Sequence, residues 1–314
     1  ANPNSEFGRW LQEEVRRIWD GYVRESDGEW VTGEMYFYLN YSPIILTKYK
    51  KGSKKGLRIV DLPKVWEGIY LRFHYWDQAR NGGLYNDWKG GNHCAEIAKR
   101  GSSKSYCMAS TLTKLFLCGE NEEARENIRA LITAYQKEYL TKDGTLNKFV
   151  SMIDFCADYT QFPSKRLKAS FQEMTWKLGY IDSITGTNKG LLNEVIGVSS
   201  KDDTDKIRGK RSSKIFVEEF GAFPNISEIH RVMIPSVEDG DLVFGQLVYC
   251  GTGGSEGCLT KNNKVHLNTG EIISIDKLKN TDHILGFDTI NKRVVAEQIK
   301  FLRESIAPCV KITT

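Results

Sequence analysis

The amino-acid sequence changes character at Cys258. Before it, Leu247-Val-Tyr-Cys-Gly-Thr-Gly-Gly-Ser-Glu-Gly257 is an apolar run followed by glycines, which is typical of a buried strand that ends in a loop. After it, apolar residues occur in short alternating pieces between turns such as Asn268-Thr-Gly270, a pattern of β-strands. We therefore divide the chain into an α/β part, residues 1–257, and an all-β part, residues 258–314.

Strands alternate with helices in the first part, which favours an α/β sheet. Apolar residues at helical spacing predict helices, and short apolar or aromatic runs predict extended segments. Asn121 is expected to cap the third helix, because acidic residues follow it. The predicted helices span residues 6–25, 105–117 and 121–138, and the predicted extended segments span residues 33–44, 215–217 and 242–250.

Composition excludes several classes of protein. No apolar run approaches the roughly 20 residues of a membrane helix. The start has neither Met nor a signal pattern, so we expect a fragment of a protein that is not secreted. The 7 cysteines are scattered without a CxxC pair, which predicts neither a disulfide framework nor a zinc site. A net charge of +4 identifies no nucleic-acid binder, so any DNA contact must come from local patches.

A phosphate-binding loop is predicted where Ala98-Lys-Arg-Gly-Ser-Ser-Lys-Ser105 leads into a helix. A helix N-terminus offers free N–H groups and the positive end of the helix dipole to phosphate. In the GxxxxGK[ST] pattern (Walker A), the Lys reaches the β- and γ-phosphates and the hydroxyl ligates Mg²⁺. Lys104 and Ser105 hold these two positions. Ala98 and Ser103 replace the two glycines, so the string by itself also fits a solvated helix start.

Two strand ends supply the other expected parts of the site. Lys214-Ile-Phe-Val-Glu-Glu-Phe220 is a short apolar strand that ends in two carboxylates, as in a Walker B motif. Beside the loop in a parallel sheet, Glu218 would lie near Mg²⁺ and Glu219 near the attacking water. Gly251-Thr-Gly-Gly254 follows the next predicted strand and would sense the γ-phosphate. Each of these two segments also has an interpretation without a nucleotide. The two carboxylates can be exposed acids after a strand, and the glycine-rich segment can be a simple turn.

In their order and spacing, these features resemble the ATPase domain of the large terminase subunit of tailed phages, over most of residues 20–257. The matching segments are Tyr36-Phe-Tyr-Leu-Asn-Tyr-Ser-Pro-Ile44, Arg100-Gly-Ser-Ser-Lys-Ser105, Arg208-Gly-Lys-Arg211 leading into Ile215-Phe-Val-Glu-Glu219, and Gly251-Thr-Gly-Gly254. An Arg four residues before the loop Lys is typical of that family, and Arg100 stands there. Glu218 departs from the family pattern, in which Asp is more usual.

The resemblance implies a P-loop NTPase sheet with flanking helices, whose ATP hydrolysis drives duplex DNA into a procapsid. The implied site comprises Arg100, Gly101, Ser102, Ser103, Lys104 and Ser105 for the nucleotide, Ser105 and Glu218 for Mg²⁺, Glu219 for the attacking water, and Thr252 and Gly253 for coupling. The implied partners are double-stranded DNA, the portal and procapsid, the small terminase subunit, and further copies of the chain in a ring. The implied location is the cytoplasm of the infected host cell.

Cys258 directly follows Gly257, which suits an N-to-S acyl shift. The thiolate attacks the Gly257 carbonyl, and glycine has no side chain to hinder the attack. The segments that surround Cys258 resemble the N-terminal part of an intein, a Hint-type fold, and imply that Cys258 is the splicing nucleophile and Gly257 the scissile carbonyl. Those segments are Cys258-Leu-Thr, Val265, Thr269-Gly-Glu-Ile-Ile-Ser-Ile275 and Asp282-His-Ile-Leu-Gly-Phe-Asp288.

The second part lacks several pieces of a splicing apparatus. No Thr-x-x-His block, no terminal His-Asn pair and no acceptor residue after such a pair occurs between Cys258 and Thr314. We therefore expect an incomplete Hint-like segment that does not splice alone. Two other functions remain open for the first part: a different P-loop NTPase that acts on nucleic acid, and a non-catalytic nucleotide- or DNA-binding scaffold.

Overall fold

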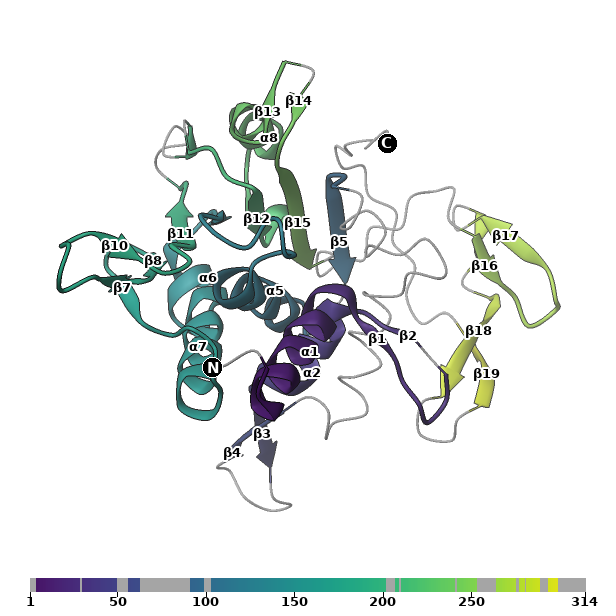
Figure 1. Cartoon of the computed structure of the whole chain (residues 1–314). Coiled ribbons are helices and arrows are strands. Elements are labelled where there is room, and N and C mark those ends of the chain that lie inside the picture. The colour runs from purple at the N-terminus through teal and green to yellow at the C-terminus, as the bar shows by residue number, and fades with distance from the viewer. Residues whose placement is uncertain are drawn as a thin grey trace. The chain divides into compact units, whose positions relative to one another are not determined.

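A computed structural model describes residues 4–28, 30–49, 56–62, 91–98, 103–201, 207–208, 210–240, 242–252, 264–274, 277–279, 281–288 and 293–298. The chain separates into two compact units, Ala1–Gly253 and Gly254–Thr314 (Figure 1). The boundary predicted from the sequence, between Gly257 and Cys258, lies outside the described residues.

A seven-stranded sheet forms the centre of the first unit, in the order β5-β15-β12-β6-β11-β8-β7 (Figure 1). The first five strands of this order run parallel, and β8 and β7 continue the sheet in antiparallel fashion at one edge. The strands are β5 (Cys94–Ala98), β6 (Arg129–Ala134), β7 (Arg166–Ser170), β8 (Thr175–Leu178), β11 (Glu194–Ser199), β12 (Lys214–Glu218) and β15 (Gln246–Thr252).

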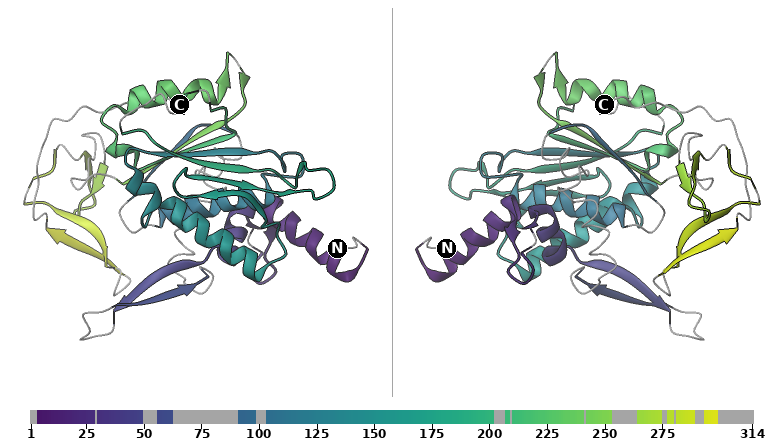
Figure 2. Two further views of the ribbon diagram at one scale, coloured as in Figure 1. Left: turned by 90° about the vertical axis from the view of Figure 1, so that its left-hand side faces the viewer. Right: turned by 90° about the vertical axis from the view of Figure 1, so that its right-hand side faces the viewer.

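Helices cover both faces of this sheet. Figure 2 shows α8 on one face and α1, α2, α5 and α7 on the other. The helices are α1 (Glu6–Asp20), α2 (Gly33–Tyr41), α5 (Lys104–Cys118), α6 (Lys137–Thr141), α7 (Thr145–Tyr159) and α8 (Ile226–Met233), with 3₁₀ turns η4 (Phe220–Ala222) and η5 (Ile234–Ser236). The unit is therefore a mixed α/β fold with a mostly parallel central sheet, as the sequence predicts.

Burial on both faces explains why the central strands are apolar. Along β12, Phe216 packs into the core on the α5 face, whereas Ile215 and Val217 pack into the core on the α8 face. This alternation follows from the two-residue period of a strand. Strands buried in this way appear in a sequence as continuous apolar runs, which is why β12 and the apolar part of β15 are correctly predicted.

The described residues of the first unit also form four antiparallel strand pairs outside the central sheet. They pair β1 (Tyr22–Val23) with β2 (Trp30–Val31), β3 (Ile44–Tyr49) with β4 (Gly56–Asp61), β9 (Tyr180–Ile181) with β10 (Asn188–Lys189), and β13 (Glu238–Asp239) with β14 (Leu242–Val243).

The N-terminal region confirms one prediction and corrects another. Of the helix predicted over residues 6–25, residues 6–20 form α1, which Ser5 caps and which ends before Gly21 in the left-handed region at φ 80°. Residues 22–23 form strand β1 instead. Residues 33–44, predicted to be extended, instead form α2 up to Tyr41, and β3 begins only at Ile44. Helix α2 is buried on nearly all sides, so it shows no amphipathic period from which a helix could be predicted.

The helix predicted over residues 121–138 is wrong. This segment contains β6 and the first residues of α6, whereas the preceding predicted helix is confirmed as α5. Asn121 accepts the N–H of Ala124 at 2.7 Å, as an N-cap would, but the chain turns there and no helix follows. Strand β6 is central and buried, and a short apolar run buried on both faces cannot be distinguished from a helix by periodicity.

The described residues of the second unit form strands and turns. Strand β16 (Lys264–His266) pairs with β17 (Ile272–Ser274), and β18 (His283–Asp288) pairs with β19 (Arg293–Gln298), both antiparallel. A bridge between Leu267 and Ile284 joins the two pairs. The assignment of a Hint-type fold to this unit stays a prediction.

Within the described ranges, no helix combines the length and the apolar character that crossing a bilayer requires. No disulfide joins the five cysteines whose side chains are described, and all five are buried, at positions 94, 107, 118, 156 and 250.

Candidate nucleotide-binding site

The carboxyl ends of the parallel strands meet at one edge of the sheet, where α5 begins. The ladders place Glu96 of β5 opposite Cys250 of β15, and Cys250 opposite Glu218 of β12. Residues in register on neighbouring strands point to the same face, so these three side chains form a row across the sheet. In open α/β sheets, the carboxyl ends of the strands are where ligands bind.

The N-terminal turn of α5 lies over this row. Ser103 is the N-cap and adopts the left-handed conformation, at φ 68° and ψ 14°. Its side chain caps no N–H group of the helix, so the first turn can present its N–H groups to an anion. Lys104 is the first helical residue and is buried. An ammonium group and a helix N-terminus thus lie together at the sheet edge.

Ser105 and Glu218 meet although their elements are far apart in the sequence. The Ser105 hydroxyl donates a hydrogen bond to Oε1 of Glu218, with 2.6 Å between the oxygens. Burial raises the pKa of the Glu218 carboxyl. The hydrogen bond from Ser105 lowers this pKa, and the negative charge of neighbouring Glu219 raises it further. The other oxygen, Oε2, is buried and has no hydrogen-bond partner.

This arrangement fits a Mg²⁺ ion. A buried carboxylate oxygen without a partner is unfavourable, and a divalent cation would satisfy it either directly or through one of its water ligands. Mg²⁺ commonly takes one or two protein oxygens and completes its shell with water and phosphate. Ser105 and Glu218 provide two such oxygens. In the described part of the chain, no three His, Cys, Asp or Glu side chains gather closely enough to hold a metal by themselves.

Glu219 has an unusual backbone for a residue with a side chain. It follows β12 directly and lies in the left-handed region, at φ 48° and ψ 51°. Such conformations cost on the order of 1–3 kcal/mol and cluster at functional sites. The turn separates Glu219 from the buried strand, and its side chain is partly exposed. Its predicted role toward a water molecule stays a prediction.

Glu96 and Cys250 belong to this edge, although the sequence contains no motif that would identify them. The Cys250 thiol lies 3.7 Å from Oε2 of Glu96 and donates to it. Burial raises the pKa of the Glu96 carboxyl, and the nearby charge of Lys104 lowers it. Burial also raises the pKa of the Cys250 thiol well above its usual range, which disfavours the reactive thiolate.

The predicted coupling segment lies next to the strand that leads into the loop. Gly251 and Thr252, the last residues of β15, pair with Ile97 and Ala98 of β5. A Cβ atom on Gly251 would lie 2.8 Å from Cε1 of Phe220, in the turn after Glu219. The end of β15 is therefore packed tightly between the strand before the loop and the turn after the acidic pair.

Several predicted site residues lie outside the described residues. These are Arg100, Gly101, Ser102, Gly253, Gly257 and Cys258. Of the remainder, the structure places Ser103, Lys104, Ser105 and Glu218 at one edge of the sheet, and Glu219 and Thr252 at the ends of the strands beside them.

Comparisons with known proteins give low similarity. No family model matches this sequence, and no curated protein matches it. The fold is similar to the large terminase ATPase domain of Thermus phage P74-26, with 16% identity and a TM-score of 0.39 over 51% of this chain and 58% of that one. It is also similar to the large terminase of bacteriophage HK97, with 15% identity and a TM-score of 0.39 over 69% and 36% of the two chains.

A third solved structure is the large terminase of the thermophilic bacteriophage D6E in complex with ADP, with 9% identity and a TM-score of 0.38 over 59% of this chain and 38% of that one. In each comparison, this chain covers less than two thirds of the protein it resembles. Similarity this low assigns no function by itself.

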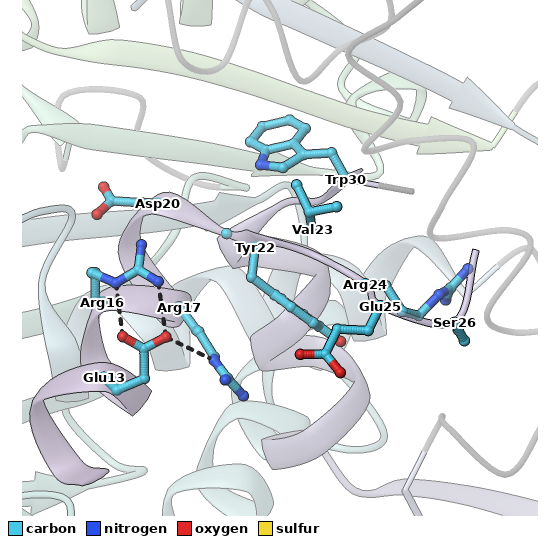
Figure 3. A pocket seen from close by; sticks show the side chains of 11 residues that line it. Glu13, Arg16, Arg17, Asp20, Tyr22, Val23, Arg24, Glu25, Ser26 and Trp30 are labelled. Carbon is cyan, nitrogen blue, oxygen red and sulfur yellow. Dashed lines mark hydrogen bonds and ion pairs between the residues drawn. The ribbon is translucent and has the colours of Figure 1, made fainter. Parts of the chain in front are cut away.

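A separate cavity of about 810 Å³ lies where α1 meets the β1–β2 hairpin (Figure 3). Glu13 accepts hydrogen bonds from Arg16 and Arg17 there, and the bond from Arg16 is the main reason that the pKa of Glu13 is lowered to about 2. Three arginines and three acidic residues line the cavity, so it has no strong net charge. Among the predicted nucleotide-binding residues that the structure describes, none lines this cavity.

Proposed function

We propose that residues 1–257 bind ATP with Mg²⁺ and form part of the motor ATPase of a DNA-packaging terminase. The observation that carries the nucleotide site is the hydrogen bond between Ser105 and Glu218. This bond joins the first turn of α5, the helix that follows β5, to the acidic end of β12. Strand β15 lies between β5 and β12 in the sheet. Together with Lys104, this supplies the charge, the N–H groups and the metal ligands that a nucleoside triphosphate requires.

Each residue has a distinct task in this proposal. Lys104 neutralises the β- and γ-phosphates, and Arg100 assists it from the loop. Ser105 and Glu218 would hold Mg²⁺, whose chemistry is to bridge phosphate oxygens and to neutralise the charge that develops on them. Glu219 orients the attacking water and accepts its proton. Thr252 passes the loss of the γ-phosphate to the neighbouring strand ends.

The test is ATP binding by the 314-residue chain in the presence of Mg²⁺, measured by isothermal titration calorimetry. The Lys104→Ala replacement removes the ammonium group that would neutralise the phosphates, so ATP binding should weaken at least tenfold. A tenfold change corresponds to about 1.4 kcal/mol. Lys189→Ala is the matched control, since Lys189 is exposed in the β9–β10 hairpin. Equal affinities for Lys104→Ala and the wild type would refute the site. Tight binding without hydrolysis by a completed protein would favour a non-catalytic scaffold.

The proposed partners are double-stranded DNA, the portal and procapsid, the small terminase subunit and further copies of the chain in a ring. The resemblance of the sequence motifs supports them. A fluorescence anisotropy titration with duplex DNA, repeated at several salt concentrations, tests the first partner. Binding that weakens steeply with salt is expected, because cationic side chains would displace counterions from the phosphates. Absence of binding at low salt would argue against a motor on DNA.

We also propose that residues 258–314 are the N-terminal part of an intein. The Cys258 sulfur would attack the Gly257 carbonyl carbon, the Gly257–Cys258 amide would break, and a thioester and a free Cys258 amine would form. We expect no ligated product from this chain. Mass spectrometry after incubation with an added thiol tests both the cleavage between Gly257 and Cys258 and the absence of a ligated product, with Cys258→Ala as control. Detection of a ligated product would refute the expectation that this chain does not splice alone.

A further inference from the structure

The first turn of α7 also faces the carboxylate of Glu218. Strand β6 lies beside β12 with Ala134 opposite Glu218, and the chain leads from there through α6 into α7. Gly144 fixes this entry, because a Cβ atom on it would lie 2.1 Å from the carbonyl oxygen of Tyr139. Helix α7 also packs against α5. Topology therefore brings the N-termini of two helices to one buried carboxylate.

Thr145, the first residue of α7, carries a second buried oxygen at this place. Its side chain is fully buried, and its hydroxyl lies close enough to the Glu218 carboxylate to act on it as a hydrogen-bond donor that lowers its pKa. The two groups nevertheless make no direct hydrogen bond of normal geometry, since neither Oγ1 of Thr145 nor Oε2 of Glu218 has such a partner. Two buried polar atoms of neighbouring groups that lack such partners have the composition of a site for an ordered water, which needs two to four polar contacts.

Lys148 brings a positive charge to the same carboxylate. It lies one turn after Thr145, and its ammonium group interacts electrostatically with Glu218. The ammonium also donates to the carbonyl oxygen of Asp143 and lies 5.3 Å from the centre of the Tyr106 ring. These two contacts hold it beside Glu218 without a direct ion pair, since no salt bridge joins Lys148 to Glu218 among the described residues.

We propose that the first turn of α7 is the second wall of the magnesium site. Thr145 and Oε2 of Glu218 together hold a water of the Mg²⁺ shell, and Lys148 is a positioning residue that balances the charge of Glu218 when the metal is absent. This inference rests on the proposed nucleotide site. It adds that metal recognition depends on α7, an element that contributes no residue to the predicted loop motifs.

The proposal predicts opposite effects for two substitutions on the same helix turn. Thr145→Val removes one hydroxyl at nearly constant volume, so the Mg²⁺ concentration needed for half-maximal ATP binding should rise about tenfold or more, as for loss of a hydrogen bond to a charged group. Lys148→Met removes a cation that competes with the metal, so that concentration should fall several-fold. A purely structural role would not shift the two variants in opposite directions.

The measurement is a Mg²⁺ titration of ATP binding by the full chain, followed by calorimetry, with binding in excess chelator as a reference. Thr145→Ser should restore the wild-type Mg²⁺ requirement. Thr141→Val is the matched control, because the Thr141 hydroxyl donates to its own helix at the carbonyl of Lys137. ATP binding in chelator should be the same for all variants.

Three outcomes would overturn the inference. One is a Thr145→Val variant that titrates like the wild type, and another is a shift in the same direction for both variants. If Thr145→Val does not fold, Lys148→Met decides alone, and an unchanged or raised Mg²⁺ requirement refutes the role of α7. Failure of the proposed function is distinguishable, because the wild type itself would then bind no ATP at any Mg²⁺ concentration.

Discussion

The ion pair between Lys114 and Glu34 offers a sharp test of how α5 is anchored. The Lys114 ammonium lies 2.6 Å from Oε1 of Glu34, and each side chain is only 2% exposed. The pair joins α5, which carries the phosphate-binding turn, to α2. We expect Lys114→Met to destabilise the protein strongly, because it removes the ammonium group from beside a buried carboxylate.

The size of the effect follows from burial. Removing one partner of a buried ion pair costs about 3–5 kcal/mol, since the remaining charge has left water and lost its counter-charge. For domains of roughly 150–250 residues, each kcal/mol lowers Tm by about 2–4 °C, so Lys114→Met should lower Tm by roughly 6–20 °C. An exposed pair contributes about 1 kcal/mol or less.

Thermal unfolding followed by circular dichroism measures the change. Arg129→Met is the control, because Arg129 pairs with Glu194 at 2.9 Å while its own side chain is 46% exposed. The double variant Glu34→Gln/Lys114→Met should recover much of the lost stability, since it leaves no buried charge behind. A Lys114→Met variant as stable as the Arg129→Met control would refute the reasoning, and so would a double variant no more stable than the single one.

Three further predictions concern stability. Burial lowers the pKa of His230 below its ordinary 6.5. Unfolding therefore takes up a proton, and the stability of the fold decreases as the pH drops below about 6.5. His230→Gln should reduce the loss of Tm between about pH 7.5 and 5.5. Asn193→Ala should cost more than about 2 kcal/mol in urea unfolding, because the buried Asn193 amide makes hydrogen bonds with four backbone groups, each of which would lose that bond. Gly119→Ala should destabilise more than Gly186→Ala, since both have positive φ but only the Cβ at position 119 would meet backbone, 2.5 Å from the Cα of Arg125; equal losses of Tm would contradict this.

The fold is predicted from the sequence where the local pattern reports the environment. Helix α1 has one apolar face, and β12 is a short apolar run that ends in acids, so both are recognised. Helix α2 and strand β6 are misassigned for the same reason, since each is buried on nearly all sides. An element of that kind carries no periodic signal, and its type is decided by packing across the whole unit.

The residues of the candidate site also fall into those that the local sequence identifies and those that only the fold brings together. Lys104 and Ser105 are recognised because the spacing of a loop that opens a helix is local in sequence, and Glu218 because it ends an apolar strand. Thr145 and Lys148 show no motif, since a threonine and a lysine at the start of a helix are common. They become candidates only when the strand order places β6 next to β12.

The position of β15 explains why the row at the sheet edge has a small residue in its centre. Strands β5 and β12 are two ladder steps apart, which is about 9.5 Å at the usual spacing, yet Ser105 and Glu218 are in hydrogen-bond contact. The first turn of α5 must therefore cross over β15 at Cys250, whose side chain lies beneath it and is buried. A small side chain lets the helix turn approach the sheet closely enough for that hydrogen bond. Because Gly251 and Thr252 continue the same strand, a shift of the α5 turn against Glu218 would act directly on the strand that leads out of the site.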